Sequence, residues 1–234
     1  MKPLLVLAAF PVVLMGWASC SHSGTGHAAL PDPRAVDKSV PEYKNPFHPS
    51  TYAHFVARKD HRKTYDGYKD DTLLNRQPKK SRKIFVCLDE QRGQYLVDGL
   101  VAMDFPLSSG VKAYPTKTGD YAVISKKEDH TSNLYGKMYD AEGKCINYNA
   151  ESTDPIPEGG RFDGSPMPYW QRLTNAGLGL HVGKVRRHPV SHGCVRLPRN
   201  VAEILYRQTS IGTPVTIRKT PLPVPEAQKV PAVQ

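Results

Sequence analysis

Residues 83–105 read KIFVCLDEQRGQYLVDGLVAMDF, and this stretch carries the clearest signal for the fold. Residues 84–88 form a short apolar run with a β-branched start, which is typical of a buried strand. Residues 94–97 predict a second strand, and Asp98-Gly99 then favours a hairpin because glycine tolerates a positive φ. Residues 101–105 alternate between apolar and other side chains, so one face of a third strand belongs to the core.

Further strands follow toward the C-terminus. Residues 121–124 and 178–180 read as strands, and Val215 with Ile217 marks the last one. A helix is predicted to run to about Gln208, capped by Asn200 with Glu203 as the capping-box partner. The whole pattern predicts a mainly β single domain over residues 82–219, a β-sandwich or barrel with one short helix. Residues 126–166 are polar and glycine-rich and predict a long loop.

Both ends of the chain are expected to lie outside this domain. Residues 1–19 combine Lys2, an apolar run too short to span a bilayer, and small residues before Cys20, which predicts a secretory signal. The ending resembles a bacterial lipobox, so Cys20 is the expected lipidation site, although Trp17 stands where leucine is usual. Residues 20–81 predict a flexible tether, and residues 220–234 predict an extended proline-rich tail.

Composition narrows the class of protein. With 39% hydrophobic and 23% charged residues in 234, the chain is ordinary for a soluble globular domain. Its formal net charge of +10 favours anionic cell-wall polymers or lipid head groups as partners. An exported protein is not expected to bind nucleic acid. The four cysteines are too few for a disulfide scaffold: Cys87 reads as a buried core residue, and Cys145 is available for a disulfide.

Two neighbouring stretches combine the residue types that nucleophilic catalysis needs. They are His181-Val182-Gly183 and, after a short basic loop, Ser191-His192-Gly193-Cys194-Val195-Arg196-Leu197-Pro198. A cysteine nucleophile attacks as the thiolate, so it needs a base, and the glycine turn can aim backbone N–H groups at an oxyanion. The pattern favours Cys194 as nucleophile. The residues alone leave the base open, with His181 preferred over His192 because Gly193 predicts a turn rather than an extended segment.

These two stretches resemble the signature of the L,D-transpeptidase catalytic-domain family. That signature is a His-x-x element, a loop, and Ser/Thr-His-Gly-Cys followed by an apolar residue and often arginine. The turn at residues 115–119 and the segment at residues 167–170 also have counterparts in the family, so the resemblance covers residues 83–218. It implies an L,D-transpeptidase-like β-sandwich or barrel. The loop between Gly183 and Gly193 is compact and resembles a short-loop branch.

The resemblance also implies roles for single residues. Cys194 would attack the carbonyl of the third residue of a peptidoglycan stem peptide and form a thioester, with His181 as base. The Gly183 carbonyl would orient His181, and the N–H groups of Gly193 and Cys194 would hold the oxyanion. His192 would support the turn. The residues expected to bind substrate are Arg196, Ser191, Trp170 and Tyr169, although the two aromatic residues also suit a core.

Several alternatives remain beside this interpretation. With water as acceptor the enzyme would be an L,D-carboxypeptidase. It could also be another cell-wall cysteine amidase, or a non-catalytic module that binds the wall through its basic surface. A zinc site from His188, His192 and Cys194 is disfavoured, because Pro189 interrupts the helix that would place both histidines on one face. We therefore expect no metal or cofactor. We expect a monomer in the cell envelope or periplasm, held to a membrane by its lipid.

Overall fold

The computed structural model describes residues 46–77, 81–221 and 223–229. All described residues belong to one compact unit of the chain. The predicted signal segment and Cys20 lie outside the described residues. Among the described residues, no helix has the length and apolar character needed to cross a membrane.

The described part of the chain is mainly β, as the sequence predicts. Its helices are α1 (Tyr52–Ala57), α2 (Asp71–Asn75), α3 (Arg199–Gln208) and the 3-10 turn η1 (Glu226–Gln228). Its strands are β1 (Tyr68–Lys69), β2 (Arg82–Cys87), β3 (Arg92–Val97), β4 (Leu100–Pro106), β5 (Gly119–Ala122), β6 (Ser125–Lys127), β7 (Thr131–Tyr139), β8 (Cys145–Glu151), β9 (Arg161–Pro166), β10 (Trp170–Arg172), β11 (Gly179–Val182), β12 (Val195–Leu197) and β13 (Pro214–Arg218).

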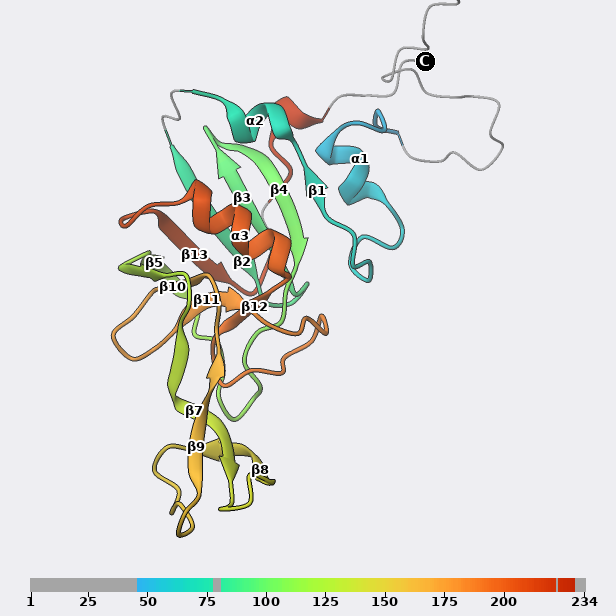
Figure 1. Ribbon diagram of the computed structural model, residues 1–234. Coiled ribbons are helices and arrows are strands. Elements are labelled where there is room, and N and C mark those ends of the chain that lie inside the picture. Colours follow the sequence, from blue (N-terminus) through green and yellow to red (C-terminus); the bar gives the residue numbers. More distant parts are fainter. Residues whose placement is uncertain (1–45, 78–80, 222, 230–234) are drawn as a thin grey trace, which may run out of the picture. The chain divides into compact units, whose positions relative to one another are not determined.

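These strands form three sheets (Figure 1). The largest has the order β1-β4-β3-β2-β13-β5, the second β12-β11-β10-β6, and the third β8-β7-β9. None of the three described sheets closes into a barrel. The predicted meander of residues 83–105 is confirmed as β2, β3 and β4, with antiparallel pairing throughout. Asp98 and Gly99 have φ values of 51° and 79°, the two positive φ values that a type I′ hairpin requires.

The hydrophobic core joins the two larger sheets through α3. Buried apolar side chains from β2, β3, β4 and β13 pack in one cluster with Leu180, Leu197 and Leu205. The predicted helix is confirmed, but it begins at Arg199, with Pro198 at the N-cap and no capping side chain. Proline has a φ that suits the start of a helix, and the predicted capping box of Asn200 and Glu203 is not formed. Glu203 instead forms an ion pair with Arg207 at 2.6 Å.

The prediction of a long loop at residues 126–166 is wrong, because most of this segment forms β6 to β9. Strands β7, β8 and β9 pair with one another and project from the larger sheets in Figure 1. Few of their side chains are buried, and β8 buries Ala150 alone. A strand exposed on both faces lacks the alternation of apolar and polar residues by which strands are recognised, so the sequence did not reveal it.

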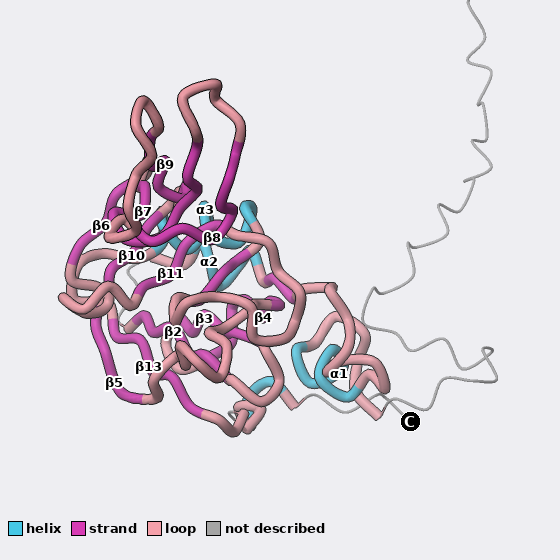
Figure 2. Tube along the Cα trace, turned by 90° about the horizontal axis from the view of Figure 1, so that it is seen from below, coloured by secondary structure: helices cyan, strands magenta, loops and turns pink. Residues whose placement is uncertain are grey.

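The tether predicted at residues 20–81 is also corrected for the part that the structure describes. Residues 46–77 carry α1, β1 and α2, and β1 pairs with β4 through Tyr68 and Asp104. Tyr52 and Phe55 of α1 form a second hydrophobic cluster with Val101 of β4. Helix α1 lies beside β4 in both Figure 1 and Figure 2. Elements this short contain too few residues to show a sequence periodicity. Their stability comes from packing against the rest of the domain.

Part of the predicted tail binds the domain as well. The amide of Gln228 in η1 pairs with the backbone of Val101, accepting from its N–H at 2.8 Å and donating to its carbonyl at 3.0 Å. Val224 packs against the cluster around α1. The side-chain amide thus satisfies backbone groups that a neighbouring strand would otherwise satisfy. Residues 222 and 230–234 lie outside the described residues.

Candidate active site

Parallel pairing of β11 with β12 brings the predicted nucleophile and base together. His181 lies opposite Arg196 in the register of the two strands, and Cys194 comes directly before β12. Both Cys194 and His181 line one pocket of about 860 Å³. His188 is exposed and does not line this pocket. His181 and His192, the two histidines between which the residues alone left the base open, both line the pocket, so His181 as base stays a prediction.

The Cys194 thiol is largely shielded from solvent. Its Sγ donates to the carbonyl oxygen of Gly177 at 3.2 Å. Burial raises the pKa of this thiol, while the Gly179 backbone N–H and the Arg196 charge act in the opposite direction. The resting side chain is therefore protonated at neutral pH, and it needs a base to become a nucleophile.

His181 is held in the form that a base needs. Its side chain is buried, and burial is the main reason that its pKa is lowered to about 4. Its Nδ1 lies 2.7 Å from the Val182 carbonyl oxygen, which can only accept, so Nδ1 carries the proton and Nε2 carries the lone pair. The orienting carbonyl is thus that of Val182, not that of Gly183 as predicted.

Gly183 has a different contact. Its N–H donates to the Leu197 carbonyl at 3.0 Å, which extends the pairing of β11 with β12. A Cβ at this position would lie 2.8 Å from Cγ and Cδ of Arg196. Glycine here leaves room for the arginine side chain to pass.

The turn from Ser191 to Cys194 is fixed by its own hydrogen bonds. The Ser191 hydroxyl donates to the Cys194 carbonyl at 2.5 Å and accepts from the Gly193 N–H at 3.1 Å. Ser191 is 2% exposed and forms the turn; it also lines the pocket, and its contact with substrate stays a prediction. The Gly193 N–H, which we expected to hold the oxyanion, thus donates to the Ser191 hydroxyl instead. Within the described residues, the Cys194 N–H has no acceptor and is available to an oxyanion.

Thr116 joins this turn to the rest of the domain. Its hydroxyl donates to the Gly193 carbonyl at 2.6 Å and accepts from the Gly110 N–H at 2.8 Å. A Cβ on Gly110 would lie 2.8 Å from the Gly193 Cα, so the two backbones are in close contact. Gly193 itself has φ +113°, which favours glycine. The sequence marked Thr116 as a turn residue, but no local pattern links it to a segment almost eighty residues away.

His192 is exposed and packs against aromatic side chains. Its ring stacks on Tyr135 of β7 at 4.2 Å between centroids, and Tyr114 lies 4.8 Å away. These contacts join the Ser191–Cys194 turn to the projecting sheet, and the supporting role of His192 stays a prediction. The two tyrosines were missed because nothing in their own segments marks them.

Of the residues expected to bind substrate, Arg196 and Trp170 line the pocket and Tyr169 does not. Arg196 lines the pocket, its pKa is lowered by burial, and no acidic side chain of the described residues pairs with it. Trp170 lines the pocket too and packs between His130 at 5.0 Å and His181 at 5.9 Å. Tyr169 does not line the pocket and instead contacts Tyr206 of α3 at 5.6 Å.

The other two cysteines of the described residues, Cys87 and Cys145, do not line this pocket. Cys87 is buried, as predicted, and its thiol donates to the Lys219 carbonyl at 3.0 Å. Cys145 is half-buried, and Cys87, Cys145 and Cys194 are all free thiols. The described residues contain no cluster of three or more His, Cys, Asp or Glu side chains that could hold a metal ion.

The chain is similar in sequence or in structure to several known proteins. Probable L,D-transpeptidase 3 of Mycobacterium tuberculosis is 31% identical over 121 residues, which are 49% of this chain and 38% of that protein. Among solved structures, an L,D-transpeptidase from Mycobacterium smegmatis aligns with a TM-score of 0.46 at 21% identity, covering 59% of this chain and 58% of the other. The chain thus spans less than two thirds of the length of these relatives.

An L,D-transpeptidase from Stackebrandtia nassauensis aligns with a TM-score of 0.44 at 21% identity, covering 71% of this chain and 65% of the other. The model of the L,D-transpeptidase catalytic domain, also called YkuD, matches residues 81–217. This range contains both β11 and the Ser191–Cys194 turn, and it is more than half of the 234 residues. The chain therefore belongs to the L,D-transpeptidase catalytic domain family.

Proposed function

We propose that this protein is a cysteine-dependent L,D-transpeptidase that forms cross-links between peptidoglycan stem peptides. The observation that carries the proposal is the meeting of the Cys194 thiol and a neutral His181 in one pocket. Membership of the family and the free Cys194 N–H beside that thiol support it further.

The first half-reaction makes a thioester. Nε2 of His181 takes the thiol proton, and Sγ of Cys194 attacks the carbonyl carbon of the third residue of a donor stem. The Cys194 N–H donates to the resulting oxyanion. The C–N bond then breaks, His181 returns the proton to the leaving amine of the D-amino acid, and the acyl group stays on sulfur.

The second half-reaction transfers the acyl group. The amine of a second stem loses a proton to His181 and attacks the thioester carbon, which releases the Cys194 thiol. The thioester conserves much of the energy of the broken peptide bond, so no nucleotide or metal is required. Arg196 lines the pocket with a guanidinium that no described acid neutralises, and it is placed to bind a carboxylate of a stem peptide.

The products of a purified disaccharide-tetrapeptide substrate test the proposal. Mass spectrometry should show a dimer lacking one terminal residue, together with the released D-amino acid. Cys194→Ala should give neither product, while Cys87→Ala keeps its activity because Cys87 is buried away from the pocket. A monomeric tripeptide as the sole product, even at high substrate concentration, would replace the proposal with an L,D-carboxypeptidase. No product at all would favour a non-catalytic wall-binding module.

We further propose that the protein acts as a monomer in the cell envelope and is anchored through a lipid on Cys20. The apolar run before Cys20 and the chain's charge of +10 support this location. The mature wild-type protein should partition into detergent, whereas Cys20→Ser should remain in the aqueous phase. Aqueous partitioning of both proteins would overturn the anchor and leave export by ordinary signal cleavage.

A further inference from the structure

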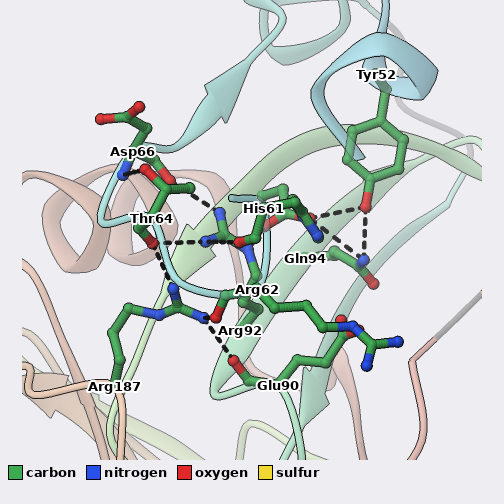
Figure 3. Close-up of polar contacts among 10 residues, drawn as sticks. Tyr52, His61, Arg62, Thr64, Asp66, Glu90, Arg92, Gln94 and Arg187 are labelled. Atoms are coloured by element: carbon green, nitrogen blue, oxygen red, sulfur yellow. Dashed lines mark hydrogen bonds and ion pairs between the residues drawn. The ribbon is translucent and has the colours of Figure 1, made fainter. Parts of the chain in front are cut away.

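The loop that connects the two halves of the site rests on a segment outside the matched family domain. Residues 60–66 precede the matched range of 81–217, and they lie between two arginines, Arg92 and Arg187 (Figure 3). Arg92 comes from β3 in the large sheet, and Arg187 comes from the loop at residues 183–190 between His181 and Ser191.

Arg92 holds the segment to the sheet. Its side chain is 1% exposed, and its Nε donates to Asp104 at 2.6 Å. Its two terminal nitrogens donate to backbone carbonyls of the segment, Nη1 to Thr64 at 3.1 Å and Nη2 to Asp66 at 2.9 Å. Hydrogen bonds from a charged donor in a buried position are the strong ones, so the backbone here is fixed.

Arg187 holds the loop to the same segment. Its Nη1 donates to the Thr64 carbonyl at 2.7 Å, and its Nη2 donates to the Arg62 carbonyl and, at 2.8 Å, to the Glu90 carbonyl. The Thr64 carbonyl therefore accepts from both arginines (Figure 3). Among the described residues, no carboxylate pairs with the Arg187 guanidinium, so backbone carbonyls alone hold it.

Two further observations support a role for this contact in holding the loop. Arg187 has φ +55°, a conformation that is strained for a residue other than glycine and persists only where its surroundings enforce it. The neighbouring Arg186 is also bound on both sides: its carbonyl accepts from the Tyr65 hydroxyl at 3.2 Å, and its N–H donates to Ser108 at 2.8 Å.

We propose that Arg187 is a positioning residue and that residues 60–66 form part of the active-site frame of this chain. Arg187 does not line the pocket, so its effect passes through the backbone. The loop it holds begins beside His181 and ends at Ser191, whose hydroxyl shapes the Cys194 turn. By fixing the middle of this loop to a rigid segment, Arg187 holds base and nucleophile in register.

Amide hydrogen exchange of the full chain tests the contact without any substrate. Arg187→Ala should raise exchange in residues 184–194 by about tenfold or more, because hydrogen bonds from a charged group are lost. Arg187→Lys should recover part of the protection. Arg186→Ala is the matched control, since the Arg186 side chain is exposed and its loop contacts are made by backbone atoms. Exchange in Arg187→Ala equal to that of the control would overturn the proposal.

Tyr65→Phe tests the contact between residues 60–66 and the loop by a change in residues 60–66. Tyr65 is 59% exposed, so removing its hydroxyl leaves the core intact even where Arg187→Ala unfolds the protein. Exchange should then rise in the loop around Arg186, and an unchanged loop would count against a frame formed by residues 60–66.

Turnover of stem peptides, which rests on the proposed function, separates positioning from substrate binding. In Arg187→Ala, kcat should fall about tenfold to hundredfold with KM nearly unchanged, because misplaced groups lose transition-state geometry. A raised KM with an unchanged kcat would make Arg187 a substrate contact and overturn the positioning role. Absence of turnover in the wild-type protein would refute the proposed function, and the exchange data would still decide the contact.

Discussion

At the scale of single residues, two opposite pKa shifts leave both reacting groups neutral at rest. Burial raises the pKa of Cys194, and burial lowers the pKa of His181 to about 4. Desolvation disfavours the charged form of either group, so a preformed thiolate–imidazolium pair is disfavoured. In the mechanism that we propose, the thiol proton is therefore transferred to His181 as the substrate reacts.

His181→Ala should therefore lower kcat/KM by about 10²- to 10⁴-fold, the usual contribution of a positioned general base. His188→Ala is the matched control, because His188 belongs to the same stretch of chain but is exposed outside the pocket. Steady-state release of the D-amino acid measures both variants. Equal losses in the two would show that the base is misassigned.

The pH dependence of kcat/KM follows from the same shift. His181 must be neutral to act as base, so activity should persist as the pH falls below the ordinary histidine value of about 6.5. It should be lost as the pH passes through about 4, where His181 becomes protonated in the folded protein. A profile measured with a stem-peptide substrate should thus place its acid limb near 4, provided that the protein stays folded. An acid limb near 6.5 would contradict the buried, neutral base.

At the scale of elements, the predicted nucleophile, Cys194, is held by contacts among several segments. The turn after Ser191 is bonded within itself through the Ser191 hydroxyl, to Gly110 through Thr116, and to β7 through the His192 ring. The shortest of these links is the 2.5 Å bond from the Ser191 hydroxyl to the Cys194 carbonyl. The hydrogen bonds of the turn fix its backbone and with it the direction of the Cys194 N–H, on which oxyanion binding depends.

Thr116→Val should test this link, because valine keeps the shape of threonine and removes its hydroxyl. The Gly110 N–H and the Gly193 carbonyl would lose their partner, so we expect a loss of about 1–3 kcal/mol in unfolding free energy and a lower kcat. Thr118→Val is the control, since Thr118 is exposed in the same turn. Urea unfolding and turnover should be measured together. A Thr116→Val protein with wild-type kcat would show that the turn holds its geometry without this link.

At the scale of the whole described unit, a buried charge pair joins the N-terminal segment to the large sheet. Asp104 is 1% exposed and binds Arg92 at 2.6 Å and the Tyr52 hydroxyl at 2.7 Å. Burial works to raise the pKa of Asp104, but the His61 ring, 3.6 Å away, and the Arg92 charge hold the pKa below its ordinary value. Its contribution to stability is therefore present at neutral pH and lost as the pH falls below the unfolded carboxyl value of about 3.9.

Asp104→Ala should destabilise the protein strongly, by about 3–5 kcal/mol, because it leaves the Arg92 charge buried without a counter-charge. Chemical unfolding followed by circular dichroism gives the difference. Asp163→Ala is the comparison, since the Arg161–Asp163 pair at 3.3 Å is exposed and such pairs contribute little. If both variants lost equally little stability, the segment would not be held by this pair.

The sequence by itself determined the mainly β class, the meander of β2 to β4, helix α3, and Cys194 as the candidate nucleophile. Those features depend on local patterns: alternation along a strand, a hairpin dipeptide, and a glycine turn before a cysteine. The three-stranded β7–β9 sheet, the folded segment at residues 46–77 and the docked Gln228 show no such pattern. Their short or two-sided polar elements are stabilised by long-range contacts.

The tertiary structure alone decided how the site is assembled. Parallel pairing of β11 with β12 brings His181 to the pocket that Cys194 lines, and the pairing partner of a strand is not encoded within that strand. The structure also shows that the Val182 carbonyl contacts the His181 ring and that the Ser191 hydroxyl bonds within the turn. It shows that Arg187 joins the loop to residues 60–66. Hydrogen bonds between distant segments depend on where the folded backbone brings its carbonyls and N–H groups, which residue identities alone do not specify.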